Sequence, residues 1–312
     1  MSSFWLAFNV VFPLLIYMVV GGFIRRCGIL SRASLEQINN MIFRLLIPLS
    51  LFFDISGADL KTAVQPELFA LVAGSITLVS VVTWVTVYRL VAEKRDAATI
   101  VQGIFRSNYV LFGTAISYSL CGEAGTAVTA ALAIVVSPLF NILAVILFET
   151  MRGSGVKPGK MLLQILKNPL VDAGLLGVVF NLLGLRVPAV LAEPLIKLGG
   201  IATPLALVTL GGLLSFESMV SHKGYLSWAV LGRLVIVPVI ALSAFIAMGY
   251  RNELLVAILA VFASPTAVAS APMAQSMGGN GALAGEIVAL SSVGSLLTMF
   301  VYIFFLSGMG FI

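Results

Sequence analysis

Two short polar segments interrupt apolar stretches of the sequence, and their residue types suit the binding of an anion. The first is Arg106-Ser107-Asn108, and the second contains Ser264, Pro265, Thr266 and Ser270. A guanidinium can hold a carboxylate through two parallel hydrogen bonds, and amide and hydroxyl groups can donate further ones. Neither segment contains Asp or Glu, the side chains expected at a cation site. We therefore predict that these residues bind a small anionic substrate and have no catalytic role.

Composition defines the environment of these segments. The chain has 312 residues, of which 60% are hydrophobic and 10% are charged, and its mean hydropathy is +1.10. Soluble domains are about 45–50% apolar and about 25% charged. The sequence therefore predicts an all-α polytopic membrane protein, and it excludes a soluble enzyme, a nucleic-acid-binding module and a secreted disulfide scaffold. A single His and two Cys outside any CxxC pattern predict neither a metal site nor a cofactor.

Ten apolar segments are long enough to cross a bilayer, which takes about 20 residues. Arg and Lys cluster in the loops after the first, third, fifth and seventh segments, whereas the opposite side has only Lys61, Arg186 and Arg251. Because cytoplasmic loops are enriched in basic residues, we predict a multi-pass protein of the cytoplasmic membrane with both termini extracytoplasmic. The predicted spans are 4–23, 38–57, 67–89, 98–120, 125–148, 168–184, 190–213, 225–248, 254–277 and 282–307.

The sequence also matches itself at an offset of half its length. The matching pairs are Pro13-Leu14 with Pro169-Leu170, Gly21 with Gly177, Gly28 with Gly184, and Pro48-Leu49 with Pro204-Leu205. We predict two five-helix repeats, residues 1–156 and 157–312. An odd number of spans inverts the second repeat relative to the first, and inverted repeats are typical of transporters with a site near the membrane midplane. The alternative is a duplication without any transport role.

The two polar segments occupy corresponding positions in the fourth and ninth spans. Pro265 and Pro272 each remove a backbone donor and crowd the preceding turn, while Asn108 and Gly113 weaken the helix of the fourth span. A helix opened at mid-membrane persists only where its bare N–H and C=O groups face protein, water or ligand. Paired interruptions therefore predict a substrate site. The alternative is a proline kink packed against a neighbouring helix.

Ionisable residues inside the predicted spans are functional candidates, because a charge within a membrane is costly. Asp54 is a candidate for coupling to H⁺ or Na⁺, and its alternative role is pairing with an Arg or Lys. Ser50 is a further candidate substrate ligand. For Arg106, a carboxylate clamp, a structural ion pair and snorkelling towards the cytoplasmic face all remain open. A structural pair or an interfacial anchor is the favoured interpretation for Arg44, Arg233 and Glu286.

These motifs resemble the auxin efflux carrier family, in its bacterial malate or malonate permease-like branch of the bile acid/auxin transporter superfamily. The resemblance rests on Arg106-Ser107-Asn108 with Gly113, on Ser264-Pro265-Thr266-Ala267-Val268, and on Gly278-Gly279-Asn280, and it extends to the repeated Pro-Leu pairs. It implies ten helices in two inverted repeats, similar to the NhaA and bile acid transporter folds. The fourth and ninth helices would be broken and cross at the centre, and transport would follow an elevator mechanism.

The resemblance also implies a role for one residue in particular. In plant members an asparagine at the crossing receives the substrate carboxylate, and Asn108 matches that position. A second asparagine of the plant members has no counterpart here, because the matching stretch offers Thr266 and Ser270. The substrate class thus stays open among mono- and dicarboxylates such as malate or malonate and auxin-like acids.

We therefore predict a secondary carrier of a small organic anion that is surrounded by membrane lipid and has no nucleic-acid partner. A homodimer is a candidate assembly. The chain has no GxxxxGK[ST] motif, so transport driven by ATP within this chain is not expected. An ion-coupled exchanger or a channel on the same scaffold is the second hypothesis, and the lack of paired acids in the polar segments counts against it. A membrane enzyme or sensor is the third.

Overall fold

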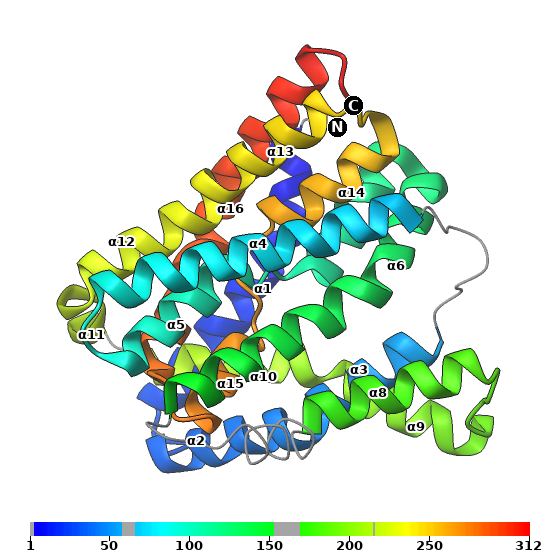
Figure 1. Cartoon of the computed structure of the whole chain (residues 1–312). Helices are drawn as coiled ribbons and strands as arrows, with labels where there is room; N and C mark the ends of the chain where they lie inside the picture. Colours follow the sequence, from blue (N-terminus) through cyan, green and yellow to red (C-terminus); the bar gives the residue numbers. More distant parts are fainter. Residues whose placement is uncertain (1–2, 58–65, 153–168, 215) are drawn as a thin grey trace.

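The fold is helical throughout the part of the chain that the computed structural model describes, which comprises residues 3–57, 66–152, 169–214 and 216–312 (Figure 1). The first half contains α1 (Ser3–Arg26), α2 (Arg32–Met41), the π-helical η1 (Ile42–Leu46), α3 (Ile47–Ser56), α4 (Pro66–Leu90), α5 (Lys94–Phe105) and α6 (Tyr109–Arg152). The second half contains α8 (Pro169–Leu182), α9 (Ala189–Gly200), α10 (Ala202–Leu213), α11 (Phe216–Ser221), α12 (Lys223–Leu231), the π-helical η2 (Gly232–Ile236), α13 (Val237–Ala247), α14 (Asn252–Ala263), α15 (Ser270–Ser276) and α16 (Gly281–Gly308).

Several of these helices have the length and apolar composition needed to cross a membrane. Six stretches meet both requirements: Arg32–Ser56, Pro66–Leu90, Ile116–Met151, Ala189–Leu213, Lys223–Ala247 and Gly281–Gly308. Two shorter helices, Pro169–Leu182 and Asn252–Ala263, are also apolar. Many large apolar side chains on these helices are exposed, which suits contact with lipid rather than water. The chain is therefore a multi-pass membrane protein.

Interruptions of the helices fall close to the predicted ones. The fourth predicted span is divided between α5 and α6, and the ninth between α14 and α15. Within α6, Gly122 has φ 62° and ψ −145°, a conformation that ends one helix and begins another. Both chain ends lie at the same end of the molecule (Figure 1). The predicted repeat boundary and some of the basic residues used to orient the chain lie outside the described residues: 156–157, Lys61, Lys157, Lys160 and Lys167.

The helices pack in two groups, which a contact between α1 and α16 joins. In one, α10 packs against α1 and α2, and α3 packs against α8 and α9. In the other, α14 packs against α6 and α13, and α16 packs against α12, α15 and α5. The α1–α10 contact is so close that a methyl group at Gly21 would lie 1.8 Å from the carbonyl oxygen of Val208. The glycine matches found in the sequence thus include a position where only a bare backbone fits.

Candidate functional site

The two broken helices meet through their backbones. Residues 106–108 separate α5 from α6, and residues 264–269 separate α14 from α15. Ser107 and Thr266 form an isolated antiparallel bridge. The Asn108 N–H donates to the carbonyl of Pro265 at 2.8 Å, and the Ala267 N–H donates to the carbonyl of Arg106 at 3.2 Å. Some of the N–H and C=O groups that lack a helical hydrogen bond in one break are therefore hydrogen-bonded to backbone groups of the other break, as a membrane interior requires.

Arg233 on η2 caps the ends of both helices that lead into the breaks. Its side chain is fully buried, and every hydrogen bond of its guanidinium goes to a backbone carbonyl. Nε donates to Ser264 at 2.7 Å, Nη1 to Ile104 and Phe105 at 3.0 and 3.1 Å, and Nη2 to Val261 and Phe262 at 2.9 and 2.8 Å. All five guanidinium N–H donors can be used in this way. A single side chain thereby joins α5 and α14.

The charge of Arg233 also matches the ends that it caps. A helix C-terminus carries roughly −0.5 of an elementary charge, so two of them together carry about −1. The guanidinium supplies the opposite unit charge, which leaves the junction of α5 and α14 close to neutral. The sequence interpretation of Arg233 as a structural residue is consistent with this contact, but its partners are carbonyls rather than an acid.

Three polar side-chain atoms near the paired breaks are buried without a hydrogen-bond partner among the described residues. They are Ser107 Oγ, Asn108 Nδ2 and Ser270 Oγ. Buried polar atoms are nearly always paired, and each exception needs an explanation. The neighbouring hydroxyls differ, because Ser264 donates to the carbonyl of Ala260 at 2.6 Å and Thr266 to that of Gly103 at 2.7 Å. Of these predicted substrate ligands, Ser107, Asn108 and Ser270 therefore have a polar atom free to bind a ligand, whereas the hydroxyls of Ser264 and Thr266 are already bonded.

Arg106 lies beside this cluster and is 4% exposed. Its Nη2 donates to Asn141 Oδ1 at 2.5 Å, and its Nη1 contacts Met273 Sδ at 2.9 Å. Among the described residues no carboxylate forms an ion pair with it. The side chain thus points into the protein, which excludes snorkelling towards the membrane surface. A buried guanidinium without a carboxylate favours an external anion.

Two of the predicted helix breaks are wrong in position. Gly113 lies inside α6, and the break precedes it at residues 106–108. A methyl group at Gly113 would lie 2.9 Å from Thr129 Cγ2, so this glycine permits close packing. Pro272 lies in the first turn of α15, where a missing N–H leaves no helical hydrogen bond unmade. Pro265 does lie within the non-helical segment.

Ser50 and Asp54 belong to α3, in the packing group of α8 and α9. Ser50 Oγ donates to Asp54 Oδ2 at 3.3 Å, and the Ser50 backbone lies against Gly199 of α9. The Asp54 side chain is exposed. The described hydrogen bonds therefore connect these two residues to each other and not to the paired breaks.

A polar cavity of about 310 Å³ lies against α15, the helix that follows the second break. It lies between the two packing groups, because α2 and α10 line one part of it and α5, α15 and α16 line the rest. Ala271, next to Ser270, forms part of its wall. The sequence did not indicate this cavity, since its lining residues come from five separated segments.

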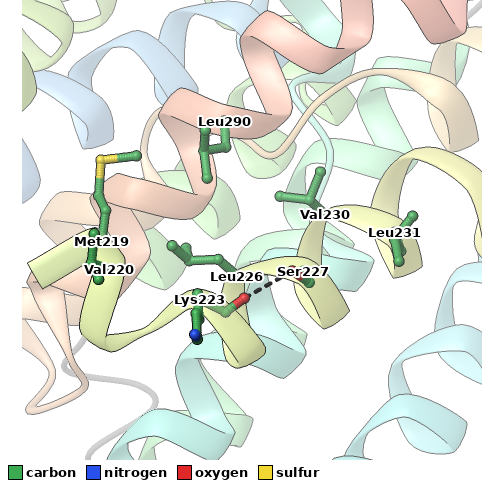
Figure 2. Close-up of a pocket in the computed structure, with 8 residues that line it drawn as sticks. All are labelled: Met219, Val220, Lys223, Leu226, Ser227, Val230, Leu231 and Leu290. Carbon is green, nitrogen blue, oxygen red and sulfur yellow. Dashed lines mark hydrogen bonds between the residues drawn. The ribbon is translucent and has the colours of Figure 1, made fainter. Parts of the chain in front are cut away.

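A second hollow, of about 630 Å³, has a different character. Figure 2 shows that its lining comes from α11, α12 and α16 and is mostly aliphatic, with Leu226, Val230 and Leu290 among the labelled side chains. Its serine, Ser227, already donates to the carbonyl of Lys223 at 2.8 Å. This groove lacks the convergent polar groups that orient a carboxylate, so the polar cavity is the better candidate.

Comparison with known proteins identifies the class. A family model described as membrane transport protein matches residues 6–303. The chain belongs to this family, which is the auxin efflux carrier family, and the resemblance found in the sequence is thereby confirmed. A search of curated proteins gave no significant match. The paired breaks, the polar cavity and the apolar helices are thus features of a membrane transporter.

Proposed function

We propose that this protein is a secondary carrier of a small organic anion and that the anion binds at the paired breaks. The observation that carries the proposal is the cluster of Ser107 Oγ, Asn108 Nδ2 and Ser270 Oγ, three buried polar atoms for which the described residues provide no partner. A carboxylate accepts several hydrogen bonds and would satisfy these donors. The cluster lies beside Arg106, whose positive charge has no carboxylate partner among the described residues.

In this proposal each residue has a distinct task. Asn108 donates from Nδ2 to the carboxylate, and the two serine hydroxyls donate to its remaining lone pairs. Arg106 supplies the charge that favours an anion over a neutral molecule. The N-terminus of α6, which begins directly after Asn108, adds partial positive charge. Ser264 and Thr266 hold the backbone in place through their hydroxyls, and Pro265 keeps the segment open.

Packing and backbone conformation support two inverted repeats of five helices, with the fourth and ninth helices crossing at the breaks. The half-chain offset relates α1 to α8 and α3 to α10. The contact of α1 with α10 in the structure is therefore the equivalent of the contact of α8 with α3. Gly28 and Gly184, which match in the sequence, have φ of 71° and 65°. Gly122 and Gly278, at the same offset, have φ of 62° and 83°. Such agreement favours a common fold of both halves.

The polar contacts between α2 of one packing group and α15 of the other support an elevator mechanism, and α1 also packs against α16. α2 contacts α15 through polar side chains, with Asn39 hydrogen-bonded to Gln275 and Ser276 Oγ donating to Asn40 Oδ1 at 2.9 Å. Contacts of this kind are more easily exchanged than an apolar interface. Movement of the group containing α5, α14 and α15 past the group containing α2 and α10 would carry the anion across the membrane.

The substrates that we propose are mono- or dicarboxylates such as malate or malonate, or auxin-like acids. The protein would lie in the cytoplasmic membrane with both termini outside, as the basic loops favour. It would act without a cofactor and as a carrier rather than an enzyme. Asp54 remains a candidate for H⁺ or Na⁺ coupling, and a homodimer a candidate assembly.

Ligand-induced stabilisation of the purified protein tests the proposed site. A carboxylate present at 100 times its Kd would stabilise the folded protein by about 2.7 kcal/mol. We expect at least one member of a carboxylate panel to raise the melting temperature of the wild type and to have no effect on Asn108→Ala. An equal rise in the variant would show that the anion binds elsewhere. The Ser227→Ala variant, altered on the exposed face of α12, is the matched control.

A further inference from the structure

One carboxyl group in the core of the protein is only partly bonded. Glu286 lies on α16, is 1% exposed, and lines the polar cavity. Its Oε2 lies 2.9 Å from His222 Nδ1. Its Oε1 is buried and has no hydrogen-bond partner in the part of the chain that the structure describes. A carboxylate held in this way has one oxygen that receives no hydrogen bond from the described protein, so its ionised form is poorly stabilised.

His222 connects this carboxyl group with the outside of the protein. It directly precedes α12, and its side chain is 21% exposed, compared with 2% for that of Glu286. Histidine exchanges protons readily near neutral pH. The pair therefore consists of a buried acid and a solvent-accessible proton donor at hydrogen-bond distance.

The other charged groups around the cavity are already engaged. Arg32 Nε pairs with Glu36 at 3.2 Å on α2, and Arg95 Nε on α5 donates to the carbonyl of Gly278 at 2.9 Å. α10 and α15, which also pack against α16, contain no titratable side chain. The remaining titratable or basic groups on helices that contact α16 lie on α1 (Tyr17, Arg25 and Arg26), α5 (Lys94 and Asp96), α11 (Glu217), α12 (Lys223 and Tyr225), η2 (Arg233) and α14 (Glu253), and α16 itself carries Tyr302.

We propose that Glu286 is a proton-binding site of the carrier and takes up one proton when an organic anion enters the polar cavity. The inference rests on the proposed function, because it assigns the ion that accompanies the substrate. It goes beyond the sequence prediction, which named Asp54 as the coupling candidate and regarded Glu286 as structural.

Charge explains why the two ligands bind together. An ionised Glu286 leaves a negative charge in the cavity. The wall of this cavity includes Ala271, the residue next to Ser270, and Gln275 of α15. Like charges in a medium of low dielectric repel strongly. A proton passing from water to His222 and on to Oε2 of Glu286, the oxygen that His222 contacts, removes that charge, and a neutral carboxyl group can donate a hydrogen bond. One N–H bond breaks and one O–H bond forms, and His222 is reprotonated from water. The net change is one proton bound for each anion.

Proton uptake and affinity can be measured on the purified protein with malonate as the probe. We expect about one proton to be taken up per malonate bound in weakly buffered detergent solution. The affinity for malonate should fall by up to about tenfold per pH unit as Glu286 becomes ionised, since one proton is linked to binding. Both effects should disappear in Glu286→Gln. They should persist in Glu67→Gln, which alters an exposed acid of α4 outside the cavity.

Infrared spectroscopy without any added anion separates this inference from the proposed function. The wild type should show a protonated carboxyl band whose intensity depends on pH, and this band should be absent in Glu286→Gln. In His222→Gln the pH dependence of the band should shift. This second variant provides a test if Glu286→Gln does not fold. If malonate fails to bind but this band behaves as expected, the substrate proposal fails and the proton site stands. Malonate binding without proton uptake, or a band unchanged in both variants, would overturn the proton site.

Discussion

Replacing Arg233 with lysine tests whether one guanidinium holds the two broken helices together. The substitution keeps the positive charge but removes the planar fork, because lysine has three donors where arginine has five. Five carbonyls, at 2.7–3.1 Å, receive hydrogen bonds in the wild type. At least two of them would lose their partner in Arg233→Lys, even if the ammonium group reached the same place.

The expected cost follows from the burial of these carbonyls. A buried polar group left unsatisfied costs about 1–3 kcal/mol, so the loss of two partners costs about 2–6 kcal/mol. At about 1.5 °C per kcal/mol for a chain of this size, the melting temperature should fall by at least about 3 °C. Arg233→Met should cost more, because it also removes the charge that compensates two helix C-termini.

Thermal unfolding of the detergent-solubilised protein, followed by the monomer peak in size-exclusion chromatography, is the suitable assay. Arg44→Lys is the matched control, since Arg44 lies in the other π-helical segment, η1, and is exposed. Exposed substitutions of this kind change stability by about 0.5 kcal/mol or less. Equal melting temperatures for Arg233→Lys and Arg44→Lys would refute the bridging role of Arg233.

Two further substitutions test the packing around the site. Gly21→Ala should destabilise the protein by about 1–3 kcal/mol, because the new methyl group would lie 1.8 Å from a backbone oxygen of α10. Gly22→Ala should be tolerated, since its nearest contact would be at 3.7 Å. Equal melting temperatures of the two variants would contradict the close α1–α10 contact. Thr266→Val should cost about 1–3 kcal/mol by removing the 2.7 Å hydrogen bond to Gly103, whereas Thr83→Val, whose hydroxyl bonds within its own helix, should cost less. A Thr266→Val variant of unchanged stability that no longer binds the anion would instead make Thr266 a ligand.

Hydropathy was sufficient to predict most of the helices. The third predicted span, 67–89, corresponds to α4 (Pro66–Leu90), and the last, 282–307, to α16 (Gly281–Gly308). Uninterrupted apolar runs define such helices because the membrane requires their length and composition. The breaks were also predictable in outline, since Pro265 and Asn108 disfavour a helix interior.

The contacts inside the site could not be predicted, because they depend on tertiary proximity. Arg233 bonds carbonyls more than 100 positions away in α5 as well as others in α14, and any residue type offers a carbonyl. Glu286 and His222 are 64 positions apart. Gly113 was misread because glycine favours both breaks and close helix packing, and only the neighbouring Thr129 distinguishes the two roles.

Uptake of labelled malonate into liposomes that contain the purified protein tests the proposed carrier most directly. The account predicts uptake that saturates with concentration in the wild type and in Ser227→Ala, and uptake at the level of protein-free liposomes in Asn108→Ala. Asn108 Nδ2 is among the donors left without a protein partner, so its removal should abolish recognition while the fold persists. Uptake by Asn108→Ala equal to that of the wild type would contradict an anion site at the paired breaks.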